Sequence, residues 1–121
     1  MEPLPERPLT LAQVQEYVAK MEEERGFSDS TLVEQTLKLA EETGEVCKAV
    51  RKRAALGVDP TSAVGGLAEE LADVLIYLAA IANREGIDLS QALRAKEAVN
   101  EKRVWISTGS GGTENATTFP T

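Results

Sequence analysis

Residues 67–82 read LAEELADVLIYLAAIA, and their apolar character is the strongest indication of the fold class. Its apolar residues fall on nearly every side of a helix that we expect from about Leu67 to Glu85, where Gly86 stops it. A helix that is apolar almost all round lies in the middle of a bundle or is covered by a partner subunit. The sequence therefore predicts a helical bundle in which this helix is central.

Three further helices are predicted from apolar residues that recur at helical spacing. Thr10 and Asp88 are suitable N-cap residues for two of them, and Thr31 with Glu34 resembles a capping box. Gly26 is expected to end the first helix. No segment alternates for long enough to predict a strand, so the expected fold class is all-α, a four-helix bundle-like domain. The predicted ranges are about 10–25, 31–56 and 88–104.

The two ends of the chain differ in composition from the helical part. Residues 1–9 hold three of the five prolines and are expected to form an irregular lead-in. The stretch 107–121 is rich in Gly, Ser and Thr and nearly uncharged, which is typical of a flexible tail. This leaves one helical domain over residues 10–106. The central helix of a bundle of this length has more apolar surface than the other helices of one chain can cover, so we expect a homo-oligomer.

Composition excludes several classes of function. The chain has 121 residues, 13 basic and 20 acidic residues, a net charge of −7 and no histidine. The lack of histidine excludes Ser-His-Asp triads, Cys-His dyads and the usual His-containing zinc and di-iron sites. The acidic charge argues against nucleic acid as a partner, because phosphate contacts require clustered Lys and Arg.

Three features of the sequence indicate the cellular compartment. The longest apolar run, residues 74–82, is far shorter than the roughly 20 residues of a membrane-spanning helix, so no membrane association is expected. The first ten residues lack the apolar segment of a signal peptide. The single cysteine, Cys47, cannot form an intramolecular disulfide, and a cytoplasmic location is expected.

Two acidic clusters contain the candidate functional residues. Residues three apart on a helix share a face, so the acids within each cluster point the same way. If the second and third helices pack antiparallel, four or five carboxylates can gather around one point. The first cluster lies in LAEETGEV (39–46) and the second in LAEELADVL (67–75); their members are Glu41, Glu42 and Glu45, and Glu69, Glu70 and Asp73.

Either cluster alone is most simply a solvated helix face, but Asp73 favours a site. It lies in an otherwise apolar segment, and no Lys or Arg occurs between Arg53 and Arg84 to compensate its charge. Burying an unpaired carboxylate costs several kcal/mol, roughly. A cation from solution removes that cost. A ligand set made only of carboxylate oxygens suits Mg²⁺ or Mn²⁺ and does not suit Zn²⁺.

These motifs resemble the MazG-like, all-α nucleoside triphosphate pyrophosphohydrolases over about residues 10–106. The family signature is Glu-x-x-Glu, a spacer, and Glu-x-x-Asp. Here it occurs as Glu42-x-x-Glu45, 24 intervening residues (46–69) and Glu70-x-x-Asp73. Each half alone is a weak signal, and the pair in a helical chain of this size is fairly specific.

The resemblance implies an activity and roles for these acids. It implies Mg²⁺-dependent cleavage, with Mn²⁺ as a possible substitute, of a (deoxy)nucleoside triphosphate to the monophosphate and pyrophosphate. The four signature acids would be catalytic metal ligands, and Glu41 matches a frequently acidic position that orients water or holds a second ion. The broad role implied is house-cleaning of the nucleotide pool, by a homo-oligomer that is a dimer or a dimer of dimers.

A further match to the family lies on the fourth predicted helix. Members often carry Lys-x-x-x-Asn-x-x-Lys/Arg followed by an aromatic residue, and here Lys96, Asn100, Arg103 and Trp105 occupy these places. Lys96, Asn100 and Arg103 are spaced i, i+4 and i+7, so on a helix they would form one stripe that could bind the phosphates and the sugar. The alternative is a solvated basic face. Trp105 either stacks on the base or anchors the helix end, and Phe27 is the other candidate for stacking.

Two other functions remain open from the sequence. Phosphoribosyl-ATP pyrophosphohydrolases share the metal motifs, although the longer segment between the motifs and the Lys96-x-x-x-Asn100-x-x-Arg103 stretch favour the MazG-like branch. The chain could also be a non-catalytic helical interaction module whose acids hold a structural ion or bind a basic partner.

Overall fold

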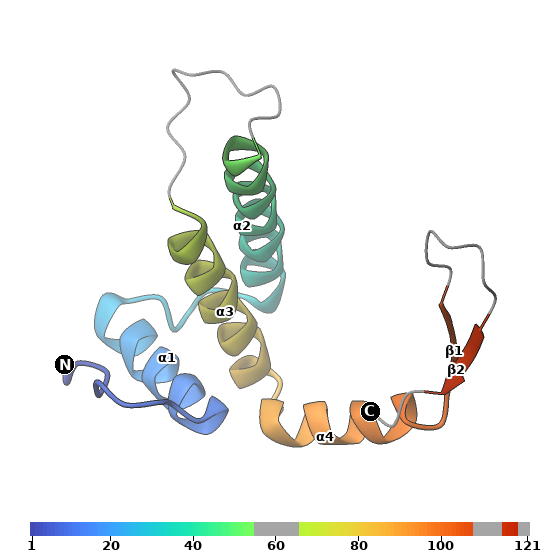
Figure 1. Ribbon diagram of the computed structural model, residues 1–121. Coiled ribbons are helices and arrows are strands. Elements are labelled where there is room, and N and C mark those ends of the chain that lie inside the picture. The colour runs from blue at the N-terminus through green and yellow to red at the C-terminus, as the bar shows by residue number, and fades with distance from the viewer. Residues whose placement is uncertain (55–65, 108–114, 119–121) are drawn as a thin grey trace. The chain divides into compact units, whose positions relative to one another are not determined.

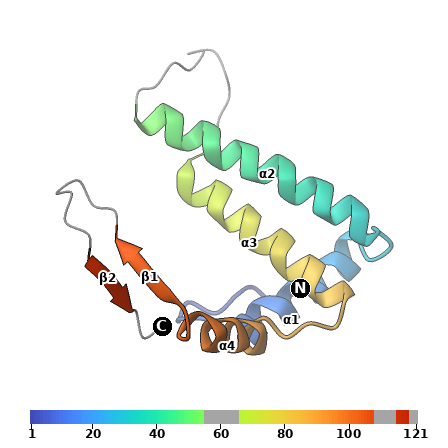
Figure 2. The same ribbon diagram turned by 90° about the vertical axis from the view of Figure 1, so that its right-hand side faces the viewer.

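The computed structural model describes residues 1–54, 66–107 and 115–118 (Figures 1 and 2). Within these ranges the fold has the four predicted helices and one two-stranded hairpin, so the fold class is all-α with a small β element added. The elements in chain order are α1 (Leu11–Arg25), α2 (Leu32–Arg53), α3 (Leu67–Arg84), α4 (Leu89–Asn100), β1 (Val104–Ser107) and β2 (Asn115–Thr118).

Helix α1 begins and ends where local chemistry predicts. The Thr10 hydroxyl accepts a hydrogen bond from the Gln13 backbone N–H, and the Gln13 side chain accepts one from the Thr10 N–H. This reciprocal pair is a complete capping box. At the other end Gly26 has a φ of 77°, in the left-handed region that glycine adopts without a steric cost.

Helices α2 and α3 run antiparallel side by side, and α1 packs against α3 (Figures 1 and 2). The predicted N-cap of α2 is present, because Thr31 accepts a hydrogen bond from the Glu34 N–H. Helix α2 ends at Arg53, and the last two positions of the range predicted for it, 55 and 56, lie outside the described residues. Helix α3 ends at Arg84, one residue before the predicted end.

The core lies between α1 and the C-terminal half of α3. Val18 and Met21 of α1 are buried against Ala79 and Ala80 of α3, and Ile76 packs partly buried beside them. Alanines at these positions let the two helix backbones approach closely. The core is therefore aliphatic.

One side of α3 is left uncovered by this packing. Leu71, Leu75 and Leu78 are 52%, 39% and 41% exposed, and their spacing of four and three residues places them on one helix face. Helix α3 was expected to be central or covered by a partner subunit. It contacts α1 and α2 and still presents this apolar leucine face.

The chain divides into two compact units, Met1–Ile87 and Asp88–Thr121. The boundary falls inside the helical domain predicted for residues 10–106. The second unit begins with the predicted N-cap, where Asp88 accepts a hydrogen bond from the Gln91 N–H at 3.0 Å. Helix α4 ends at Asn100, so the prediction that it continues to Val104 was wrong.

The hairpin replaces the last predicted turn of α4 and part of the predicted tail. Strand β1 pairs antiparallel with β2, with Val104 opposite Thr118. Valine, tryptophan and isoleucine at positions 104–106 favour strands, and this preference prevails over the helical pattern here. The structure differs from the flexible tail predicted for 107–121 at Asn115–Thr118; residues 108–114 and 119–121 lie outside the described part of the chain.

Within the described ranges, no helix combines the length and the apolar character that crossing a membrane requires.

Arg84 at the end of α3 holds the connection between α1 and α2 in place. Its guanidinium forms a two-pronged ion pair with the buried carboxylate of Glu22 on α1. The same group donates to the backbone oxygens of Ser30 at 2.7 Å, Phe27 at 3.1 Å and Ala80 at 2.9 Å. One side chain thus fixes α1, α3 and the loop that leads into α2.

We expect Arg84→Met to lower the free energy of unfolding by about 3–5 kcal/mol, because it leaves the buried Glu22 carboxylate unpaired. Urea unfolding measures this change. Lys20→Met is the matched control: it removes the exposed Lys20–Glu16 pair, which solvent screens, and should leave the free energy of unfolding nearly unchanged. Equal losses in both variants would contradict a special role for Arg84.

Candidate metal centre

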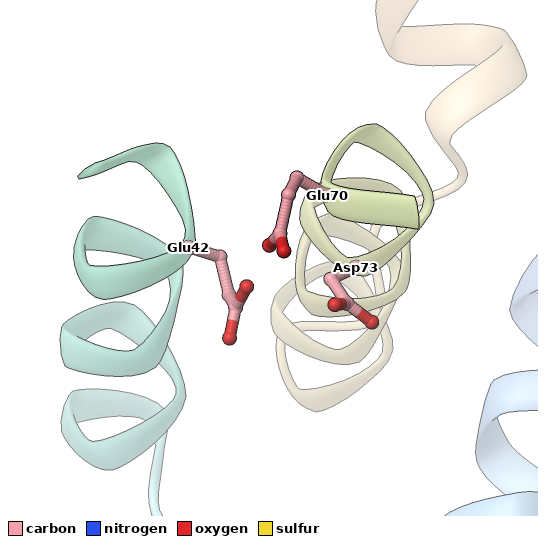
Figure 3. A group of neighbouring side chains, drawn as sticks. All are labelled: Glu42, Glu70 and Asp73. Atoms are coloured by element: carbon pink, nitrogen blue, oxygen red, sulfur yellow. The ribbon is translucent and has the colours of Figure 1, made fainter. Parts of the chain in front are cut away.

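Three carboxylates from two helices meet between α2 and α3. Glu42 extends from α2 towards Glu70 of α3, and Asp73 lies one turn further along α3 (Figure 3). One carboxylate oxygen from each residue lies within 4.8 Å of the other two. The two halves of the sequence motif are therefore brought to one place.

The local fold explains this arrangement. Glu70 and Asp73 are three residues apart, so one helix face presents both. Because α2 and α3 are antiparallel neighbours, Glu42 reaches the same face from the opposite side. The antiparallel packing on which the sequence expectation depended is present.

The electrostatics of the cluster are repulsive. Burial raises the pKa of Glu42 above its ordinary value of 4.5, and the carboxylates of Asp73, Glu70 and Glu45 raise it further. The ion pairs recorded between described residues involve other acids. The cluster is therefore short of positive charge.

Tyr77 belongs to this neighbourhood, although the sequence analysis did not single it out. Burial raises the pKa of its phenol, and the carboxylates of Glu42, Asp73 and Glu41 add to the effect. The phenol therefore keeps its proton and can donate a hydrogen bond. The available signal was its position four residues after Asp73, which places both on one face of α3.

The remaining acids of the two sequence clusters lie at the margin of the site. Glu45 is half-buried one turn along α2 from Glu42, and Glu41 and Glu69 are exposed. None of these three joins the group of mutually close oxygens found among the described residues. Phe27, the candidate for base stacking, follows the C-cap of α1 and is half exposed.

The residues predicted to clamp the substrate are in the second unit. Lys96 and Asn100 lie on α4, but Arg103 lies in the turn after the helix and Trp105 in β1. The prediction of one helical stripe through all three polar residues was therefore wrong at Arg103, because the helix ends earlier. Asn100 donates to Glu97 at 3.0 Å, and its Oδ1 atom is buried without a partner among the described residues.

The donor set fits a hard divalent cation. Glu42, Glu70 and Asp73 offer only carboxylate oxygens, which Mg²⁺ and Mn²⁺ prefer. A divalent ion at this place would neutralise the negative charges that, together with burial, raise the pKa of Glu42. No Cys or His belongs to the group, so soft-ligand metals are disfavoured.

We expect the stability of the metal-free protein to fall as pH rises, through Glu42. Folding raises the pKa of Glu42, so the folded protein binds this proton more tightly than the unfolded chain does. The protonated carboxyl therefore adds to the free energy of unfolding below the unfolded pKa near 4.5, and this stabilisation is lost as the pH rises through the folded pKa. Thermal unfolding in EDTA from pH 4 to 8 measures it. Glu42→Gln should flatten this pH dependence and unfold at a higher temperature at pH 8.

Adding Mg²⁺ should raise the wild-type unfolding temperature and leave the variant nearly unchanged, because a ligand stabilises only the state that binds it. Identical pH profiles for the two proteins would contradict the repulsion.

Comparison with known proteins gives a family match and several relatives. The family model described as the MazG nucleotide pyrophosphohydrolase domain matches residues 27–103. A curated dATP/dGTP diphosphohydrolase of Salmonella phage PMBT28 is 38% identical over 96 residues, which are 79% of this chain and 28% of that protein. The chain thus spans little more than a quarter of this relative.

Solved structures with the same fold also match. The cyanophage S-2L MazG-like pyrophosphohydrolase, bound to dGDP and three catalytic Mn²⁺ ions per active site, has a TM-score of 0.61 and 28% identity and covers 90% of this chain and 94% of its own. The iMazG of Vibrio DAT 722 has a TM-score of 0.55 and 29% identity, covering 76% and 98%. The family match, the shared fold and the paired carboxylate motif lead to one assignment: the chain belongs to the MazG nucleotide pyrophosphohydrolase family.

Proposed function

We propose that the chain is a Mg²⁺-dependent nucleoside triphosphate pyrophosphohydrolase, which converts a (d)NTP to the monophosphate and pyrophosphate and so cleans the nucleotide pool. The observation that carries this proposal is the group of three carboxylates between α2 and α3. Family membership and the nucleotide-cleaving relatives support it. The Mn²⁺ ions of the cyanophage protein support a divalent cofactor, for which Mn²⁺ can substitute.

The metal would be held by Glu42, Glu70 and Asp73, with Glu45 one turn away as a further ligand. When bound, the ion supplies positive charge for the phosphates and lowers the pKa of a water molecule. The oxygen of a water molecule attacks the α-phosphorus, the bond to the bridging oxygen breaks, and pyrophosphate leaves. Since the chain has no histidine, a carboxylate accepts the proton of that water, and the exposed Glu41 is assigned the role of orienting the water or holding a second ion.

Substrate binding is assigned to residues of the second unit and to the loop after α1. Lys96 and Arg103 supply positive charge for phosphate oxygens, and Asn100 supplies an amide for the sugar. The buried, unpartnered Oδ1 of Asn100 supports this role. Phe27 and Trp105 are the candidates for stacking on the base.

We expect pyrophosphate release from a panel of nucleotides with Mg²⁺ and none with EDTA. Glu42→Gln and Asp73→Asn should each lower kcat by at least about 100-fold, because each removes charge that holds the ion. Glu23→Gln, an exposed acid on α1, is the control and should retain wild-type kcat. Coupled detection of pyrophosphate measures all four proteins.

Other outcomes of that assay contradict the proposal in distinct ways. No release from any nucleotide would favour a non-catalytic helical module. Release confined to phosphoribosyl-ATP would favour the related branch of the superfamily. Full activity in either metal-ligand variant would remove the metal assignment.

The chain is further proposed to act as a homo-oligomer, a dimer or a dimer of dimers. The support is the apolar leucine face of α3, formed by Leu71, Leu75 and Leu78, which neither α1 nor α2 covers. An apolar face of this kind on a single chain is typical of a protein interface. A symmetric pair of chains would bury it on both copies.

We expect Leu75→Glu to convert the oligomer to a monomer, because a charge at the centre of this face has no partner across the interface. Light scattering after size exclusion measures the mass. Leu93→Glu, at an exposed leucine of α4, is the control and should keep the wild-type mass. A monomeric wild-type protein would contradict the oligomer.

A cytoplasmic location is part of the same proposal. The nucleoside triphosphates that it would cleave are cytoplasmic metabolites. Cys47 is a free, exposed thiol, which a reducing compartment preserves.

A further inference from the structure

A small cavity opens beside the carboxylate group, between α1, α2 and α3. Its volume is about 180 Å³, and Asp73 forms part of its wall. Pockets that enclose a whole drug-sized ligand measure roughly 300–1,000 Å³, so this one fits a single ring system. A nucleotide whose phosphates lie at the carboxylates would place another of its groups here.

Gln35 of α2 lines this cavity and has an unusual environment. It is 4% exposed, one of few polar residues buried to this degree in the described ranges. Among the residues that the structure describes, its side-chain amide makes no hydrogen bond with another side chain or with the backbone. A carboxamide offers two donors and an acceptor, and the amide of Gln35 has these groups available towards the cavity that it lines. This arrangement points to a ligand that supplies the missing partners.

The buried carboxylate in the wall of the cavity already has a partner. Glu22 is paired with Arg84, and Arg84 is further occupied by backbone oxygens of the loop after α1. Lys38 and Arg25 also line the cavity but are exposed. Among the described residues of this wall, Gln35 is therefore a mostly buried polar side chain that is uncharged and still able to pair with a ligand.

The rest of the wall suits an aromatic ring. Met21, Ile76 and Ala80 supply apolar surface, and Tyr77 adds an aromatic ring to the lining. Apolar walls with one or two fixed polar groups are typical of pockets that orient a flat ligand. Phe27 completes the lining and is half exposed.

We propose that this cavity takes the nucleobase of the substrate, that the base is a purine, and that Gln35 is the residue that selects it. This inference rests on the proposed function, because it assumes that the triphosphate lies at the carboxylates. The amide places a donor beside an acceptor, which matches the N6 amino group and ring nitrogen of adenine. Turned by 180°, it matches the O6 and N1–H of guanine, so one residue admits both purines.

The relatives favour the purine class over the pyrimidines. The phage relative is a dATP/dGTP diphosphohydrolase, and the cyanophage structure holds dGDP. Since a single amide can also pair with pyrimidine edges, the choice between the two classes is an outcome of the experiment.

The test compares wild type with Gln35→Met, a variant of similar size without hydrogen-bonding groups. We measure kcat/KM for dATP, dGTP, dCTP, dTTP and base-free deoxyribose 5-triphosphate with Mg²⁺. The variant should lose about 5- to 150-fold on both purine substrates, the range for one bidentate base contact. Its rate on the base-free triphosphate should not change. Gln91→Met, at an exposed glutamine of α4, is the matched control and should behave as wild type.

A second variant separates base selection from a structural role. Gln35→Glu keeps the shape and replaces the donor by an acceptor, so it should raise the dGTP to dATP preference, because guanine presents two adjacent donors, N1–H and N2–H. The urea midpoint of nucleotide-free Gln35→Met should stay at the wild-type value, since the amide makes no hydrogen bond with another described residue that its removal could break.

Each contrary outcome has one meaning. A purine preference that survives in both Gln35 variants, an equal loss on the base-free triphosphate, or a lowered urea midpoint overturns the inference. A wild-type preference for pyrimidines overturns the purine class. No pyrophosphate release by wild type from any substrate instead contradicts the proposed function.

Discussion

Three carboxylates held between two helices repel one another, and the packing of the first unit has to offset this repulsion. The carboxylates of Glu42, Glu70 and Asp73 lie close together, and burial together with the charges of its neighbours raises the pKa of Glu42. The helices nevertheless stay together, because packing elsewhere offsets the repulsion. The α1–α3 core and the Arg84–Glu22 pair lie towards the other end of α3.

Much of the fold could be predicted from the sequence because its signals are local. Thr10, Gly26 and Asp88 set helix ends by hydrogen bonds or a backbone angle within a few residues. The hairpin could not be predicted, because Val104 pairs with Thr118, fourteen positions away in a segment of low complexity. Strand pairing is a long-range choice that periodicity does not reveal.

The candidate site could be predicted from the sequence only in part. Spacing placed Glu70 and Asp73 on one face, and only the packing of α2 against α3 could add Glu42. Gln35 was missed because a glutamine on a helix carries no sign of its surroundings, and Tyr77 was missed because its spacing from Asp73 shows a shared helix face but not burial. Their significance comes from burial and from the presence or absence of neighbours, which are tertiary properties.

The neutrality of Gln35 has a consequence for how affinity and selectivity respond to ionic strength. Phosphate recognition by Lys, Arg and a divalent ion is electrostatic and weakens as salt screens it. A carboxamide in a buried pocket carries no net charge, so its hydrogen bonds with a base are nearly indifferent to salt. High salt would then lower the affinity for every nucleotide by a similar factor, and the order of preference among the bases would stay the same.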